Sequence, residues 1–70
     1  MAATDVIFTA DELAACAERE VRFRERVYRD RLTRGKMRPE QARREIAMMR
    51  AIAEDYRRRA EDDSLFGSRT

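Results

Sequence analysis

The chain has 70 residues, of which 43% are charged, yet its formal net charge is only +2. A monomer of this size buries only about 60% of the surface that its unfolded chain exposes, so such short chains are commonly stabilised by disulfides, a metal or oligomerisation. Histidine is absent and Cys16 is the single cysteine, which excludes an internal disulfide and any His-dependent catalytic triad and argues against a transition-metal site. We therefore expect oligomerisation, and no catalytic activity, cofactor or metal.

The N-terminal segment "MAATDVIFTADE" lacks the basic and then apolar order of a signal peptide, and no apolar segment of the chain is long enough to cross a membrane. We therefore expect a soluble, cytoplasmic protein with no membrane partner. Cys16 is expected to be a small buried apolar residue rather than a reactive thiol.

A first helix is predicted over residues 10–34. In "FTADEL", Thr9 can act as the N-cap with Glu12 at the third helical position, which is the pattern of a capping box. No helix breaker follows until Gly35, and glycine favours the position just after a helix end.

A second helix is predicted over residues 39–62. It begins at Pro39, whose missing N–H has no cost at the first helical position, and it ends at "EDDS" before Gly67. Two helices of similar length with a short connection predict an antiparallel hairpin. The chain is thus divided into an N-terminal tail (1–8), the hairpin (9–63) and a C-terminal tail (64–70).

Apolar residues in both segments repeat at the spacing of an antiparallel helix pair. On the second helix they step alternately by four and three residues, as in a heptad seam. With the turn centred near residue 37, the first helix matches them in reverse order. The pairs are Leu32 with Ala42, Tyr28 with Ile46, Arg24 with Met49, Val21 with Ala53, Ala17 with Tyr56, and Leu13 with Ala60.

Arg24 is the one charged residue in this seam. Glu20 precedes it by one helical turn on the same face, in the favourable Glu-to-Arg order. One interpretation is that Arg24 lays its methylene groups on the seam and pairs with Glu20 or Glu45 at the edge. The other is that it sets the register of a multi-helix core or is left open to anchor a partner.

Both helices carry more apolar surface than one hairpin can cover. Their apolar arcs span about 160–180°, whereas a one-sided contact uses about 100°. A lone hairpin would leave Phe23, Val27, Met48 and Ile52 in water, so we expect these residues to form the interface of a homodimer, an all-α four-helix bundle. The competing interpretation is that part of this surface binds a different protein.

The segment "RLTRGKMRPEQARREI", residues 31–46, forms the tip of the predicted hairpin and is rich in positive charge. Fifteen of the 16 basic residues of the chain are arginine, which suits bidentate and stacked contacts. Such a tip could neutralise phosphates, so the alternative function is that of a small basic nucleic-acid-binding accessory protein. Against it, the long helices lack the short recognition unit of a helix–turn–helix. A solvated tip without a role is the third possibility.

The pattern "EREVRFRERVY…L..GKM…QA.REIAMMRAIAEDY", from Glu18 to Tyr56, resembles small helical-hairpin proteins of Mu-like phages and prophages, including the phage anti-quorum-sensing protein family. The resemblance covers over half of the chain. It depends on the arginine-rich segment before Tyr28, the turn around Gly35, and the run that ends at Ile52.

The resemblance implies a hairpin that dimerises and binds host regulators, and targets associated with the family include a quorum-sensing transcription factor and a pilus-assembly ATPase. It thus implies a phage- or prophage-derived protein, in the cytoplasm of the bacterial host, that inhibits or modulates a host protein by occluding a surface. A transcription regulator is the expected target. Arginine commonly anchors such contacts, and the candidate partner-binding residues are Arg22, Arg24, Arg26 and Arg29.

Overall fold

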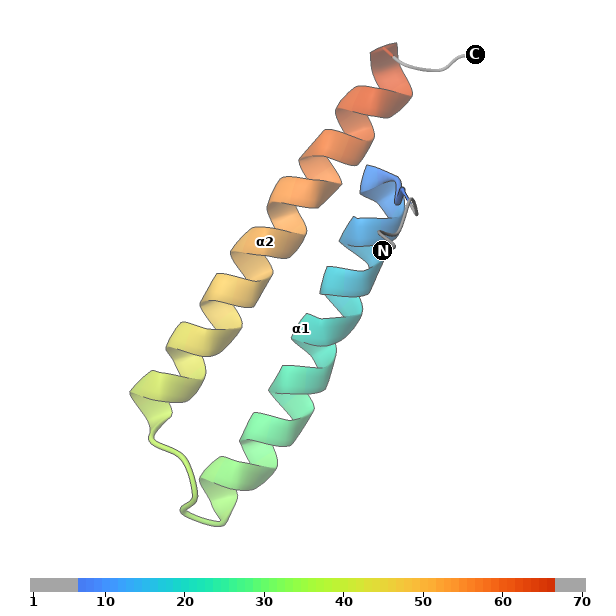
Figure 1. The fold of residues 1–70 in the computed structure, drawn as a ribbon. Helices are drawn as coiled ribbons and strands as arrows, with labels where there is room; N and C mark the ends of the chain where they lie inside the picture. Colours follow the sequence, from blue (N-terminus) through green and yellow to red (C-terminus); the bar gives the residue numbers. More distant parts are fainter. Residues whose placement is uncertain (1–6, 67–70) are drawn as a thin grey trace, which may run out of the picture.

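The computed structural model describes residues 7–66, and within them it contains two α-helices and no strand. The first helix, α1, spans Ala10–Thr33, and the second, α2, spans Pro39–Phe66. The two helices lie side by side and antiparallel, joined by a short connection at one end (Figure 1). The predicted all-α hairpin is therefore confirmed, and neither of the described helices is apolar enough over a sufficient length to span a membrane.

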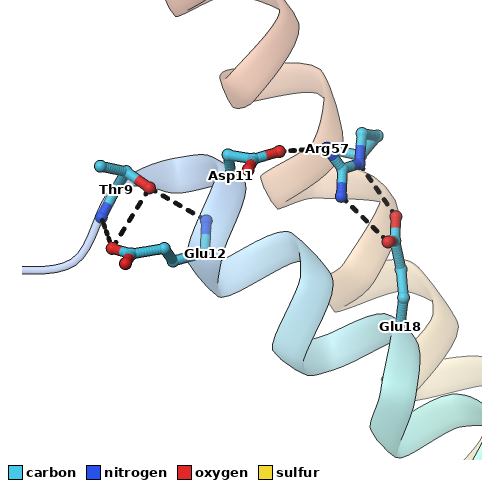
Figure 2. Close-up of polar contacts among 5 residues, drawn as sticks. All are labelled: Thr9, Asp11, Glu12, Glu18 and Arg57. Atoms are coloured by element: carbon cyan, nitrogen blue, oxygen red, sulfur yellow. Dashed lines mark hydrogen bonds and ion pairs between the residues drawn. The ribbon is translucent and has the colours of Figure 1, made fainter.

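The start of α1 is stabilised by the predicted capping box. The Glu12 N–H donates to Thr9 Oγ1 at 3.0 Å, and the Thr9 N–H donates to Glu12 Oε1 at 2.9 Å (Figure 2). The first of these bonds satisfies an N–H group that has no partner within the helix. Asp11 and Glu12 also place negative charge at the positive end of the helix dipole.

The end of α1 is a glycine turn. Gly35 adopts a positive φ of 70°, and its N–H donates to the Leu32 carbonyl at 3.1 Å. The Lys36 N–H donates to the Arg31 carbonyl at 2.8 Å. This pair of bonds is a Schellman motif, which satisfies two carbonyl groups of the last turn and reverses the chain.

The second helix begins at Pro39 as predicted, but it continues to Phe66 rather than ending near Asp62. The segment "EDDS" disfavours a helix only weakly, and it contains neither proline nor glycine. The first three residues of the predicted C-terminal tail are thus helical. The rest of the two predicted tails, residues 1–6 and 67–70, lies outside the described residues.

The core between the helices is narrow and built from small side chains. No large side chain among the described residues is fully buried. Small residues allow two helices to approach closely, but they remove little apolar surface from water. The buried apolar residues are Ala14, Ala17, Val21, Ala42 and Ala53.

The predicted seam holds along α2 and needs two corrections on α1. Ala14, which the predicted pairing omits, is fully buried, and Leu13 beside it is only half-buried. Leu32 is 36% exposed, because its expected partner Ala42 is too small to cover it. With Ala14 in place of Leu13, the seam of α1 steps strictly by three and four residues from Ala14 to Tyr28, as a heptad seam requires.

Candidate functional site

One edge of the hairpin is joined by two ion pairs between the helices. Glu18 pairs with Arg57, and Glu25 pairs with Arg50. The two acids are seven residues apart on α1, and the two arginines are seven apart on α2. A heptad spacing on both helices brings each acid opposite one base, so these four residues form what we call the ion-paired edge.

Arg57 is the most highly connected side chain of this edge. It donates to Glu18 twice, from Nε at 3.0 Å and from Nη2 at 2.9 Å, and its Nη1 donates to Asp11 Oδ1 at 2.7 Å. Figure 2 shows the guanidinium of α2 placed between these two carboxylates of α1. The hydrogen bond from Arg57 lowers the pKa of Glu18 below its ordinary value of 4.5, and the bond to Glu18 in turn raises the pKa of Arg57.

At the opposite edge of the hairpin, Arg24 joins α1 to α2. Its Nε donates to Glu20 Oε2 at 2.9 Å, and its Nη1 donates to the Glu45 carbonyl at 3.2 Å and lies 3.5 Å from the Glu45 carboxylate. The hydrogen bond to Glu20 raises the pKa of Arg24. The predicted pairing of Arg24 with Glu20 or Glu45 is confirmed, and it forms with both. The guanidinium is thus committed to contacts within the hairpin.

Beside the Arg24 edge lies a surface that we call the apolar face, formed by Cys16, Phe23, Val27, Met48 and Ile52. In the isolated hairpin Phe23 is 49% exposed and Ile52 is 47% exposed. Met48 is similarly exposed, and Val27 is half-buried. The two helices contribute to the same face because Arg24 of α1 and Glu45 of α2, whose side chains lie 3.5 Å apart, join the helices on this side of the hairpin.

The expectation that Cys16 is buried is wrong for the hairpin, since the residue is exposed. At 100° per residue, Cys16 lies roughly 110° from the centre of the buried line of α1. It precedes Phe23 by one heptad and therefore shares the apolar face with it.

Three of the four candidate partner-binding arginines, Arg22, Arg26 and Arg29, are exposed on α1. We call them the arginine surface. The Arg26 guanidinium lies 5.7 Å from the centre of the Phe23 ring, where a cation–π contact orients it. Arg22 lines an open groove between the helices whose floor includes Val21 and Ala53. The arginine surface therefore combines exposed positive charge with a small apolar floor.

The tip of the hairpin, where the two helices are connected, is strongly basic, and the opposite, open end is acidic. Residues 29–44 contain seven bases and two acids. Residues 10–18 contain three acids and no base, and residues 54–63 contain five acids and three bases. Of the tip arginines, Arg34 pairs with Asp30 at 3.1 Å. The described hairpin is therefore a charge dipole along its long axis, with about five unit charges of opposite sign at its two ends.

The ion-paired edge was not predicted from the sequence, although a signal for it exists. Glu18 and Glu25 flank Val21 by three and four residues, and Arg50 and Arg57 flank Ala53 in the same way. Charges in these positions beside a heptad seam commonly pair between helices. The pairing becomes visible only once Val21 and Ala53 are placed opposite each other.

Nothing within residues 7–66 forms a cluster of three or more His, Cys, Asp or Glu side chains that could hold a metal ion. Comparison of the chain with protein-family models, with curated proteins and with solved structures found no match.

Proposed function

We propose that this chain is a small protein-binding protein that self-associates through its apolar face and inhibits or modulates a second protein by covering a surface that the second protein needs. The observation that carries the proposal is the division of apolar residues. The hairpin buries only alanines and one valine in its core, whereas Phe23, Met48 and Ile52 remain about half exposed. A chain that leaves its largest apolar side chains in solvent gains most of its stability by association.

The proposed homodimer would cover the large apolar side chains that the hairpin leaves exposed. Burying the exposed half of a side chain such as Ile52 contributes on the order of 1 kcal/mol, and a symmetric contact repeats each contribution twice. The dimer is then a four-helix bundle in which the apolar faces are covered and the ion-paired edges remain at its surface.

The arginine surface is the proposed contact for the second protein. All three arginines are exposed: Arg22 lines the groove beside the ion-paired edge, and Arg26 stacks on the Phe23 ring at the border of the apolar face, so dimerisation leaves their charged groups at the surface. A host protein with an acidic patch would complement them, and a transcription regulator is the class that the resemblance to phage hairpin proteins implies. Arg24 acts as a positioning residue, because its bonds to Glu20 and Glu45 hold α1 in register with α2.

The test is a pull-down from bacterial lysate with the tagged chain, followed by calorimetric titration of the recovered protein. The triple variant R22E/R26E/R29E should keep the helical content and the dimer mass, because exposed charges contribute only about 0–1 kcal/mol each to stability. It should lose most of its affinity for the recovered protein, since like charges then face each other. The matched control is R38E/R43E/R44E at the tip, which should retain that affinity even though the loss of tip charge weakens self-association.

A basic nucleic-acid-binding protein is the second candidate, and the charge of the tip favours it. The tip carries seven bases, most of them exposed arginines. If nucleic acid is not the target, random duplex DNA should bind with a Kd of only about 10⁻⁴ to 10⁻⁶ M at physiological salt. A nanomolar, sequence-selective complex that R38E/R43E/R44E abolishes would replace the protein-binding proposal.

A further inference from the structure

We infer that the second copy docks on the apolar face in the antiparallel orientation, with the basic tip of each hairpin beside the acidic open end of the other. This inference rests on the self-association in the proposed function and adds the geometry of the contact. It makes the partner of the apolar face another copy of this chain, related by a two-fold axis perpendicular to the helices.

The charge dipole of the hairpin selects the orientation. Residues 29–44 at the tip have a net charge of +5, from seven bases and two acids. The opposite end has a net charge of −5, from −3 over residues 10–18 and −2 over residues 54–63. A parallel dimer would place the two basic tips side by side and the two acidic open ends side by side, so that like charges meet at both ends. An antiparallel dimer places opposite charges together at both ends.

The apolar face is positioned for such a contact. Cys16, Phe23 and Asp30 follow each other at intervals of seven residues, so they lie on one line of α1 with Phe23 in the middle. Ile52 lies near the same level of α2, because Ala53 beside it is opposite Val21. A two-fold axis near Phe23 therefore packs the centre of each apolar face on the centre of the other.

The size of the face agrees with a stable dimer. Helices of about 36 Å that lie side by side, each about 10 Å wide, give this whole side of the hairpin, which the apolar face shares with the Arg24 contacts, a footprint of about 700 Å². Stable protein interfaces bury about 800 Å² on each partner. Arg22 lines the groove beside the ion-paired edge, away from this contact, whereas Arg26 stacks on Phe23 at its border, so the two binding surfaces adjoin at Arg26.

Crosslinking through cysteine distinguishes the two orientations. In the antiparallel dimer Cys16 lies beside position 30 of the second copy, and the two Cys16 thiols are separated by about 21 Å along the helix axis, or fourteen residues at 1.5 Å each. In a parallel dimer the two Cys16 residues lie at the same level. The reagents are the full wild-type chain, a tagged variant C16S/D30C whose single cysteine is at position 30, and a short bis-maleimide.

The expected result is a crosslinked product between the wild-type chain and the C16S/D30C variant in a mixture, with little product from either chain alone. Efficient crosslinking of the wild-type chain to itself would overturn the orientation but leave the proposed dimer intact. A monomer at every concentration tested would overturn both this inference and the self-association in the proposed function. A dimer that gives neither product would overturn the inferred axis.

Salt provides a second readout that needs no substitution. In the antiparallel dimer the ends attract, so the Kd of self-association should rise several-fold between about 0.05 and 0.5 M NaCl as charges are screened. In a parallel dimer the ends repel, and the Kd should fall over the same range. A Kd that decreases with salt would therefore contradict the inferred orientation.

Discussion

Arg57 of α2 donates two hydrogen bonds, of 3.0 and 2.9 Å, to the Glu18 carboxylate of α1, across 39 positions of sequence. A bidentate arginine–carboxylate pair has a defined geometry, so it constrains how the two helices can slide past each other. The same guanidinium reaches Asp11, near the start of α1. Near the open end of the hairpin, one arginine of α2 therefore joins two acidic residues of α1.

We expect R57M to lower the melting temperature of the protein by a few degrees. Methionine preserves the unbranched stem and helix propensity of arginine but removes all three hydrogen bonds to α1. The matched control is R58M, because the ion pair of Arg58 among the described residues lies within α2, with Asp55. Thermal unfolding followed by circular dichroism at equal protein concentration should separate the two variants. Equal melting temperatures would show that the Arg57 contacts do not stabilise the hairpin.

The Glu18 carboxylate predicts how stability depends on pH. Its pKa in the folded protein lies below the ordinary value of 4.5 because Arg57 donates to it. A lowered folded-state pKa means that the contribution of the ionised group is complete above the unfolded pKa and is lost as pH falls through the folded pKa. The free energy of unfolding should therefore decrease below about pH 4.5.

The variant E18Q should show a shallower acid dependence than the wild-type chain in urea titrations between pH 3 and 6. In an R57M background the same substitution should change the slope far less, because the cause of the pKa shift is gone. An equal change of slope in both backgrounds would mean that Arg57 is not the residue that lowers the pKa of Glu18.

Arg24 should tolerate an apolar replacement better than a truncation. R24M retains contact with the seam and should change stability by less than about 1 kcal/mol, because partly exposed ion pairs contribute little beyond well-packed apolar groups. R24A loses both the packing and the bonds to Glu20 and Glu45, and should be less stable by about 1–2 kcal/mol. Urea unfolding measures both. If R24A is as stable as the wild-type chain, Arg24 does not hold the helices in register.

Replacing Gly35 should lower the stability of the protein because of the backbone conformation at this position. Its φ of 70° is unfavourable for residues with a Cβ, and a Cβ added there would meet no atom within 4 Å. We expect G35A to reduce stability by about 1 kcal/mol and G35N to reduce it less, since asparagine adopts positive φ more readily. Equal effects of the two substitutions would indicate that the cost comes from another source than the backbone.

The hairpin could be predicted because three of its four helix boundaries are encoded locally. Thr9 with Glu12 marks the start of α1, Gly35 marks its end, and Pro39 marks the start of α2. The heptad spacing then requires the helices to pair. The end of α2 was placed too early, because "EDDS" is only a weak helix terminator.

The surfaces could be predicted only in part. The exposed Phe23, Met48 and Ile52 follow from the width of the apolar arcs. Ala14 was missed because a single alanine adds little to an apolar pattern, although its position makes it the most deeply buried residue. The pairing of Arg57 with Glu18 depends on the relative register of two segments that are far apart in sequence, which local spacing alone does not determine.

The central claim is that the hairpin is half of a larger helical assembly, and the mass of the protein in solution tests it most directly. Light scattering after gel filtration at micromolar concentration should give twice the chain mass of 8.3 kDa. The variant I52D should give the mass of one chain, because the dimer would bury an unpaired charge. Its control, A47D, adds the same charge at an exposed position about 140° around α2 from Ile52 and should remain dimeric. A wild-type chain of 8.3 kDa that unfolds cooperatively as a monomer would contradict the account.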